Sequence, residues 1–273
     1  MNTTKISSAR AEARSKFSAG YRPRLLSNGN IKLRKRGTIA EEWFITGLSL
    51  APAKISGYNM CAGSSPECRK FCLFGTGMAS EFMHKQNVGH NSIWATRIVK
   101  TLWYMEDRLS FMDRLVLQIG NLSRKHDRLG IRLNVFSDRP WETQQVHVDQ
   151  IQAKRAGVRP GVYRNLMEVF PQVQFYDYTK ILKRLDQWHL PANYHLTFSL
   201  CEDNTLDATR ALFKGYNVAA VMDEMPDRFL GHRVIDGDEH DLRFLDPTPV
   251  VVRLKPKGAL ARSDSPFVQR MVA

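Results

Sequence analysis

From about residue 42 onward, the hydrophobic positions of the chain fall into short apolar runs that alternate with longer amphipathic stretches. Apolar and β-branched residues dominate seven of the short runs, which predicts strands. The longer stretches repeat their apolar positions every three or four residues, as helices do. The predicted strands are 42–50, 131–136, 173–178, 194–200, 217–222, 232–235 and 250–254, and the predicted helices lie within 78–127 and 205–214.

Strands that are apolar throughout and alternate with helices predict a mostly parallel sheet covered by helices. About 230 residues holding six or so such units favour an α/β fold of the partial or complete (β/α) barrel type over two small domains. We therefore predict a basic N-terminal arm, residues 1–40, followed by a single barrel-like domain, residues 41–273.

Polar side chains gather where several predicted strands end. The carboxyl ends of parallel strands share one edge of a sheet, and α/β enzymes carry their active sites there. The candidate catalytic residues are Asp138, Tyr178 and Lys180, and the candidate cofactor contacts are Asn134, Ser137, Glu142 and Ser199. Structural roles for these residues stay open. Ser137 and Asp138 could cap a helix, and Tyr178 and Lys180 could belong to an aromatic strand with a solvated lysine.

Three of the four cysteines fall within the loop after the first strand, which we name the cysteine loop (residues 61–72). No apolar run is long enough to span a bilayer and the N-terminus lacks the apolar core of a signal peptide, so we expect a cytoplasmic protein without membrane contact. Disulfides are not expected there, so Cys61, Cys68 and Cys72 are candidate metal ligands.

Thiolates are the natural ligands of both iron–sulfur clusters and zinc. Three of them on a [4Fe–4S] cluster leave one iron free for a substrate or a second cofactor. A structural zinc site would need a fourth ligand, which His84, His90 or Cys201 could supply, but the usual paired knuckle spacing is missing. Three unligated thiols are the remaining alternative. Of these three alternatives, we predict the [4Fe–4S] cluster.

The net charge of +13 is concentrated at the N-terminus, because residues 1–36 carry ten Lys or Arg against one acid. This leaves +4 for residues 37–273. Such an arm suits a nucleic-acid phosphate backbone, and a solvated tail that aids solubility is the equal alternative.

Two further patterns bear on function. A Tyr nucleophile near a Lys, as in Tyr178 and Lys180, would suit a rolling-circle nickase, but the chain has no His-x-His triplet for its metal. The acidic stretch 236–241 would suit a divalent ion, or a solvated loop paired with arginines. Phosphate-loop, dinucleotide and nucleophile-elbow motifs are absent from the sequence.

With these residues in view, the chain resembles the gene product eighty-eight family of phage and plasmid proteins. The matching stretches, which cover most of residues 41–258, are 46–72, 133–142, 173–180, 194–199 and 234–246. The resemblance implies a protein of a phage or another mobile element, and hence the host cytoplasm, without implying a particular activity.

The chain is more distantly similar to radical S-adenosylmethionine proteins, in which a three-cysteine loop also follows the first strand of an α/β barrel. Their cysteines are separated by three and then two residues, whereas six and then three separate these, and Ser137-Asp138 stands where a Gly-Gly-Glu segment is usual. This similarity implies S-adenosylmethionine as a second cofactor. The expected function is an iron–sulfur enzyme, and the alternative is a nucleic-acid-binding or replication-associated protein with a structural metal centre.

Overall fold

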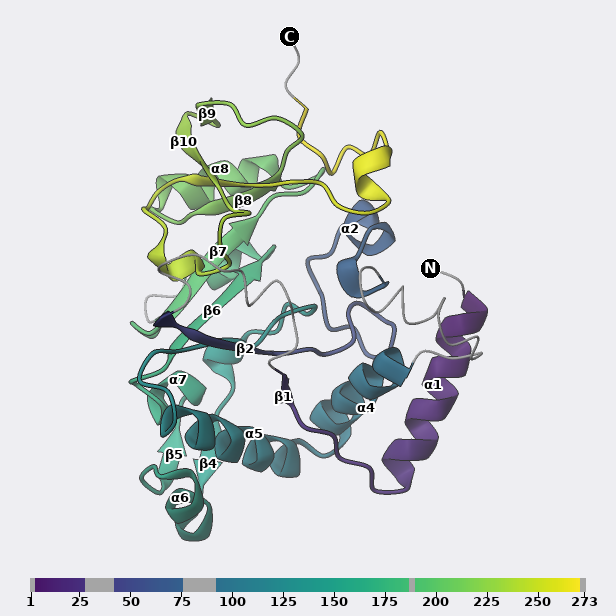
Figure 1. Cartoon of the computed structure of the whole chain (residues 1–273), viewed down its shortest axis with the longest axis vertical. Coiled ribbons are helices and arrows are strands. Elements are labelled where there is room, and N and C mark those ends of the chain that lie inside the picture. Colours follow the sequence, from purple (N-terminus) through teal and green to yellow (C-terminus); the bar gives the residue numbers. More distant parts are fainter. Residues whose placement is uncertain (1–2, 28–41, 76–91, 187–189, 271–273) are drawn as a thin grey trace.

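The seven apolar runs of the sequence form seven parallel strands at the centre of one mixed sheet (Figure 1). The structure, a computed structural model of the chain, describes residues 3–27, 42–75, 92–186 and 190–270. In spatial order the strands are β1 (Leu26–Ser27), β2 (Phe44–Leu48), β3 (Leu129–Arg132), β6 (Gln174–Thr179), β7 (Tyr194–Ser199), β8 (Val218–Val221), β11 (Val251–Leu254), β10 (His232–Asp236) and β9 (Arg228–Phe229).

The prediction of an α/β fold with a mostly parallel sheet is confirmed. Strands β2, β3, β6, β7 and β8 follow one another in chain order, as in a barrel wall. Strand β11 then lies between β8 and β10, and β10 pairs antiparallel with β9 at its other edge. Among the described strands no pairing joins β1 to β9, and closure into a barrel stays a prediction.

Helices cover one face of the sheet and bury its largest core cluster. Leu115 and Ile119 of one helix, for example, are fully buried with Ile131 and Phe175 of the strands. The helices that contribute to this cluster are α4 (Ser92–Glu106), α5 (Arg108–Ser123), α6 (Gln150–Ala156), α7 (Leu166–Val169) and α8 (Thr205–Phe213). The short helix α2 (Pro66–Lys70) has no buried residue, and a separate hairpin pairs β4 (Val146–Val148) with β5 (Gly161–Tyr163).

Turns of 3-10 helix connect several of these elements. They are η3 (Leu73–Gly75), η4 (Trp141–Thr143), η5 (Leu182–Arg184), η6 (Arg243–Leu245) and η7 (Leu260–Arg262). The η6 turn packs on the opposite face of the sheet, where the Phe244 ring contacts Trp43 and Tyr176 edge-on at 4.7 and 5.4 Å between centroids. The sheet therefore has an extensive helical face and a second face covered by the 236–246 segment.

Part of the predicted basic arm is folded. Helix α1 (Thr3–Ser18) packs along α4, and Ala9 and Ala13 are fully buried between them (Figure 1). Arg14 pairs with Glu106 at 2.6 Å, and Lys16 pairs with Glu12 at 2.5 Å. These cations are thus engaged within the protein, while the basic residues 32–36 lie outside the described residues.

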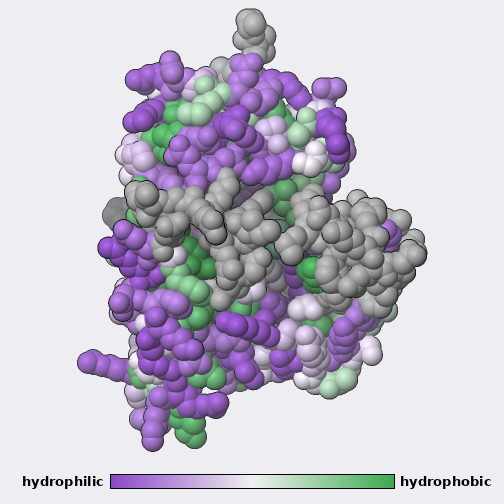
Figure 2. Space-filling view, viewed as in Figure 1, coloured by the Kyte–Doolittle hydropathy of each residue, from purple (hydrophilic) through white to green (hydrophobic). Residues whose placement is uncertain are grey.

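No described helix combines the length and the apolar character that crossing a bilayer demands. The face seen in Figure 2 is mainly hydrophilic, with apolar residues scattered over it. The part of the predicted helical region from 78 to 91 lies outside the described residues.

Candidate functional site

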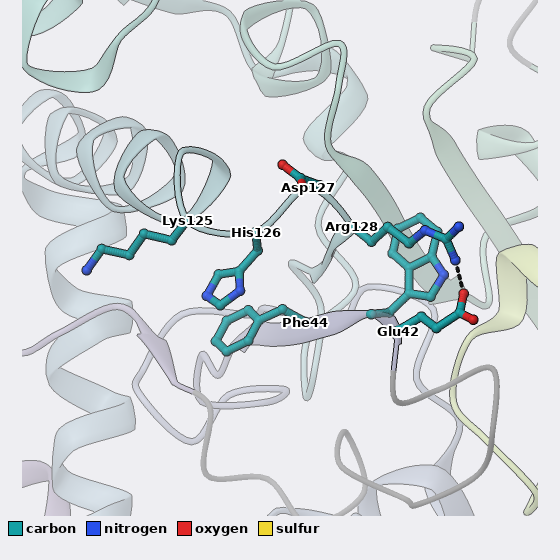
Figure 3. A pocket seen from close by; sticks show the side chains of 7 residues that line it. Glu42, Phe44, Lys125, His126, Asp127 and Arg128 are labelled. Carbon is teal, nitrogen blue, oxygen red and sulfur yellow. Dashed lines mark hydrogen bonds and ion pairs between the residues drawn. The ribbon is translucent and has the colours of Figure 1, made fainter.

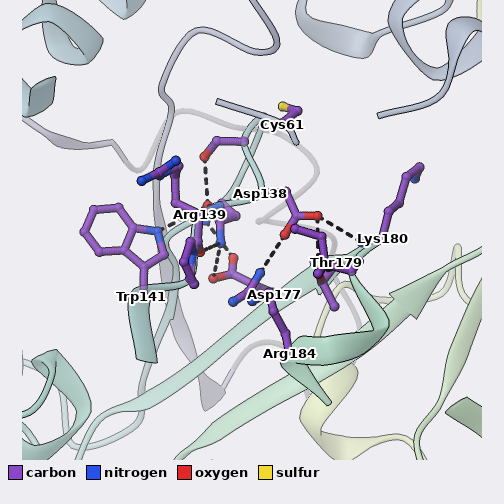
Figure 4. Close-up of polar contacts among 12 residues, drawn as sticks. Cys61, Asp138, Arg139, Trp141, Asp177, Thr179, Lys180 and Arg184 are labelled. Atoms are coloured by element: carbon purple, nitrogen blue, oxygen red, sulfur yellow. Dashed lines mark hydrogen bonds and ion pairs between the residues drawn. The ribbon is translucent and has the colours of Figure 1, made fainter. Parts of the chain in front are cut away.

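The cysteine loop and the end of β3 meet at the carboxyl edge of the sheet (Figure 4). Cys61 forms an isolated parallel bridge with Asp138, and the Asp138 N–H donates to the Met60 carbonyl at 2.9 Å. The loop also lies directly on the end of β6, because a Cβ added at Gly63 would meet the Lys180 Cβ at 3.1 Å. The predicted convergence of loop and strand ends is therefore present for Cys61, Asp138 and Lys180.

Helix α2 is short, and its start is fixed by the end of a distant strand. The side chain of Ser65 caps the helix by accepting from the Cys68 N–H at 3.1 Å, and Pro66 begins the first turn. The carboxylate of Glu202, which follows β7, accepts from the Ser65 hydroxyl at 2.8 Å and from the Glu67 N–H at 3.0 Å. Glu202 thus holds the cysteine loop against the sheet.

The three thiols of the loop are half-buried, unpaired by disulfides and within electrostatic reach of one another. Burial raises the pKa of Cys61 to about 12, and the neighbouring Cys72 and Cys68 add to the rise. Burial likewise raises the pKa of Cys72 to about 11, with a further contribution from Cys68. In the described ranges no three His, Cys, Asp or Glu side chains form a ready-made metal site.

Hydrogen bonds and cations surround the sulfur atoms of the loop, and the Cys61 thiol itself donates to the Phe136 carbonyl at 3.3 Å. The Ala53 N–H donates to the Cys61 Sγ at 3.3 Å and acts to lower its pKa. Arg97 and Lys180 act in the same direction on the pKa of Cys72. Burial in turn lowers the pKa of Arg97 to about 10, and its guanidinium lies 4.3 Å over the Phe136 ring.

Asp138, a predicted catalytic residue, is engaged through both carboxylate oxygens. One oxygen accepts from Arg184 Nη1 at 2.6 Å, and the other accepts from the Lys180 N–H at 2.9 Å and the Thr179 hydroxyl at 3.2 Å. Arg184 also binds the buried Glu142 through two hydrogen bonds of 2.8 Å each. Asp138 and Glu142 therefore flank one buried guanidinium.

Asn134 and Ser137 form the centre of the adjoining network. The Asn134 backbone and side-chain N–H groups donate to Asp177 at 2.7 and 3.1 Å. Its carbonyl oxygen accepts from the Ser137 hydroxyl at 2.8 Å and from the Trp141 indole at 3.2 Å. Burial raises the pKa of Asp177 to about 7, against the opposing effect of the Asn134 N–H. These contacts hold the end of β3 to β6.

Lys180 and Ser199, predicted at different strand ends, lie together. The Lys180 ammonium donates to the Ser199 hydroxyl at 2.6 Å and stands 5.4 Å from the centroid of the Phe267 ring. The fourth cysteine, Cys201, is buried nearby and lies 3.1 Å from the Asp203 carboxylate. Burial raises the pKa of Cys201 to about 12, while Lys180 acts to lower it.

Tyr178 lies on the second face of the sheet, away from Asp138. Its hydroxyl donates to Asp241 at 3.4 Å, and the guanidinium of Arg132 lies 4.5 Å over its ring. Asp241 also accepts from Tyr176 at 3.3 Å and pairs with Arg132 at 3.2 Å. Tyr176 and Tyr178 thus share this face, while Asp177 contacts Asn134 and Tyr194 on the other. The acidic stretch 236–241 is paired with basic residues at Asp238 and Asp241.

Three residues of this region were not among the predicted site residues. Arg184 neutralises the buried acids, Glu202 caps α2, and Arg97 lies beside Cys72. The sequence could have identified Glu202, because it stands in a polar cluster directly after a predicted strand. Arg184 lies in a short hydrophilic turn and Arg97 in a helix, so neither position marks a site from sequence alone.

Comparison with known proteins places the chain in a family. No curated protein and no solved structure matches it. The sequence does match the family described as gene product 88, over residues 24–271. That range includes the cysteine loop and all the strand ends described above. The chain therefore belongs to the gene product 88 family.

Proposed function

We propose that this protein is an iron–sulfur enzyme of a phage or another mobile element, in which Cys61, Cys68 and Cys72 hold a [4Fe–4S] cluster. The observation that carries the proposal is the placement of three half-buried thiols, none of them in a disulfide, in one loop that meets the carboxyl edge of a parallel sheet. Active sites of parallel α/β folds lie at that edge.

The chemistry of the donor set fits such a cluster. All three ligands are thiols, and backbone N–H groups of Ala53 and Phe74 donate to the sulfur atoms of Cys61 and Cys72, as suits thiolates bound to iron. The raised pKa values keep these thiols neutral without a metal, whereas a bound metal deprotonates a coordinating thiol. A [4Fe–4S] cluster on three thiolates supplies one iron with an open position for a substrate or S-adenosylmethionine.

The remaining strand-end residues have distinct roles in this proposal. Arg97 and Lys180 offset the negative charge of the thiolate ligands, because both already act on Cys72. Asp138 fixes the backbone of Lys180 and so the position of its side chain. Lys180 and Ser199 present an ammonium and a hydroxyl on the cluster side, where they would bind the carboxylate or carbonyl oxygen of S-adenosylmethionine or a substrate.

The test is metal analysis of anaerobically purified protein, with single Cys→Ser variants. We expect about four iron and four sulfide per chain, with broad absorption near roughly 400 nm. C61S, C68S and C72S should each lose most of this iron. C201S is the matched control, because Cys201 is buried outside the cysteine loop, and its iron content should match that of the wild type.

Two outcomes contradict the proposal. A colourless protein with stoichiometric zinc would make the centre a zinc site. Equal iron content in C201S and the three loop variants would mean that the loop does not hold the metal.

A further inference from the structure

A groove lined by cations runs between the segment that leads into β1 and one face of α5. Its volume is about 380 Å³. No carboxylate lines it among the residues that the structure describes, and its lining residues are Arg22, Pro23, Arg24, Arg114, Gln118, Asn121, Leu122 and Lys125. In Figure 2 the surface is mainly hydrophilic where Figure 1 places α5. The groove is thus a local positive surface on the body of the protein, remote in sequence from the cysteine loop.

The sequence builds this groove from helical spacing and one anchoring side chain. Arg114, Gln118, Asn121 and Lys125 are spaced by four, three and four residues, so they lie along one side of α5 and its end. The Gln118 side-chain oxygen accepts from the Leu25 and Leu26 N–H groups at 3.1 and 3.0 Å. This contact fixes the two walls of the groove relative to each other.

The cations of the groove keep most of their charge available. In the described part of the chain, Arg24, Arg114 and Lys125 have no carboxylate partner within ion-pair distance. Arg22 has a distant partner in Asp107 at 3.7 Å. Helix α1 differs, because Arg14 there is paired with Glu106 at 2.6 Å. A polyanion would therefore contact the groove more favourably than α1.

A second pocket of about 530 Å³ adjoins the groove and shares Lys125 with it (Figure 3). The rings of Phe44 and His126 stack in its lining, 3.7 Å apart and within 7° of parallel. Its Arg128 is paired with Glu42 and adds little free charge. Cations next to a stacked aromatic pair form the combination with which proteins bind single-stranded nucleic acid: phosphates on the cations and a base on the rings.

We propose that the groove and the adjoining pocket bind single-stranded nucleic acid, with the backbone phosphates on Arg24, Arg114 and Lys125 and a base against His126. We expect the binding to be sequence-tolerant, because phosphate contacts and ring stacking carry it and both are common to all nucleotides. This inference is independent of the iron–sulfur proposal, because no residue of the cysteine loop lines either pocket.

The test is fluorescence anisotropy of a labelled oligothymidine of about 20 nucleotides with the full chain, as a function of salt. Neutralising two phosphate contacts in R114Q/K125Q should weaken binding roughly 50-fold at about 0.05 M salt and lower the salt slope by about 1.4. The control is K154Q/R155Q, which removes the same charge from two exposed positions on α6 and should leave both values near those of the wild type. H126A should weaken binding several-fold with an unchanged salt slope.

Several results would overturn the proposal. Equal losses in R114Q/K125Q and K154Q/R155Q would mean that only net charge matters. Tighter binding of a duplex, or equal competition by inorganic polyphosphate, would refute the single-stranded ligand. Wild-type affinity in R114Q/K125Q, with binding lost when the four cations of residues 32–36 are neutralised, would place the contact outside the groove. Circular dichroism of each variant confirms that it is folded.

Discussion

Replacing Arg184 by methionine tests how the strand-end network is held together. The Arg184 side chain is 3% exposed and donates two hydrogen bonds to Glu142, one to Asp138 and one to the Tyr194 hydroxyl. Tyr194 in turn donates to the buried Asp177 at 2.8 Å. R184M therefore removes the guanidinium that binds Asp138 and Glu142 directly and Asp177 through the Tyr194 hydroxyl.

The expected loss is large because Glu142 and Asp177 cannot recover water as a partner. Removing one member of a buried ion pair costs about 3–5 kcal/mol, so we expect R184M to lower the free energy of unfolding by about that amount. Unfolding by urea, followed through tryptophan fluorescence, gives this value directly. The matched control is R164M, since Arg164 is exposed and its pair with Glu168 spans 3.7 Å, so the loss there should stay under about 1 kcal/mol.

The pH dependence and a second substitution separate this cause from a simple packing defect. Without the guanidinium, protonation relieves the unpaired carboxylates, so the deficit of R184M should shrink as the pH falls from about 8 to about 5. E142Q should also offset part of the loss in R184M/E142Q, because the double variant removes one of the unpaired charges. A deficit below about 1 kcal/mol, or one that is equal at both pH values and unrelieved by E142Q, would refute the reasoning.

Two other substitutions give independent tests of the fold. Burial raises the pKa of Asp177 from 3.8 to about 7, so the folded state binds this proton more tightly. The contribution of this group to stability is therefore full below about pH 4 and falls by about 4 kcal/mol as the pH rises to about 7. D177N should flatten that slope in urea titrations, and an unchanged slope would contradict the assignment. G120A should cost about 1–3 kcal/mol, because its new Cβ would lie 2.2 Å from the Ala156 carbonyl oxygen. N121A, on the exposed side of the same helix, should change stability little, and equal effects of the two would refute the close approach.

The sheet was predictable because its strands carry their own signal. A run such as Val218–Val221 is apolar on both faces, as expected for a parallel strand that is covered on both sides. The insertion of β11 between β8 and β10 was not predictable, since no local pattern specifies which strands become neighbours. Helix α1 was missed because its buried face consists of small residues such as Ala9 and Ala13 within a highly charged segment.

The sequence predicted where the candidate site lies, at the carboxyl edge of the sheet, but it did not predict the roles of the residues there. Asp138 and Asn134 follow an apolar strand, which locates them, and the sequence leaves open whether they face a ligand or another side chain. For Asp138 that choice depends on Arg184, which lies at the end of η5, 46 residues further along the chain, and pairs with the Asp138 carboxylate. A buried acid near a strand end therefore predicts a site only when the cation that neutralises it is also known.

The strand-end residues divide by how much hydrogen-bonding capacity they have left. Both oxygens of Asp138 accept bonds from the protein, whereas the Lys180 ammonium has three N–H donors and gives one of them, among the described residues, to Ser199. Lys180 is thus the group here that can still bind an oxygen of a ligand. K180M should weaken S-adenosylmethionine binding to the iron-loaded protein at least about tenfold without changing iron content, because an ammonium–carboxylate contact is charge-assisted. D138N should instead lower the free energy of unfolding by about 1–3 kcal/mol. Isothermal titration measures the loss of binding in K180M, and urea unfolding measures the loss of stability in D138N. If K180M bound S-adenosylmethionine as tightly as the wild type does, the ligand contact would lie at Asp138 or at a residue outside this edge.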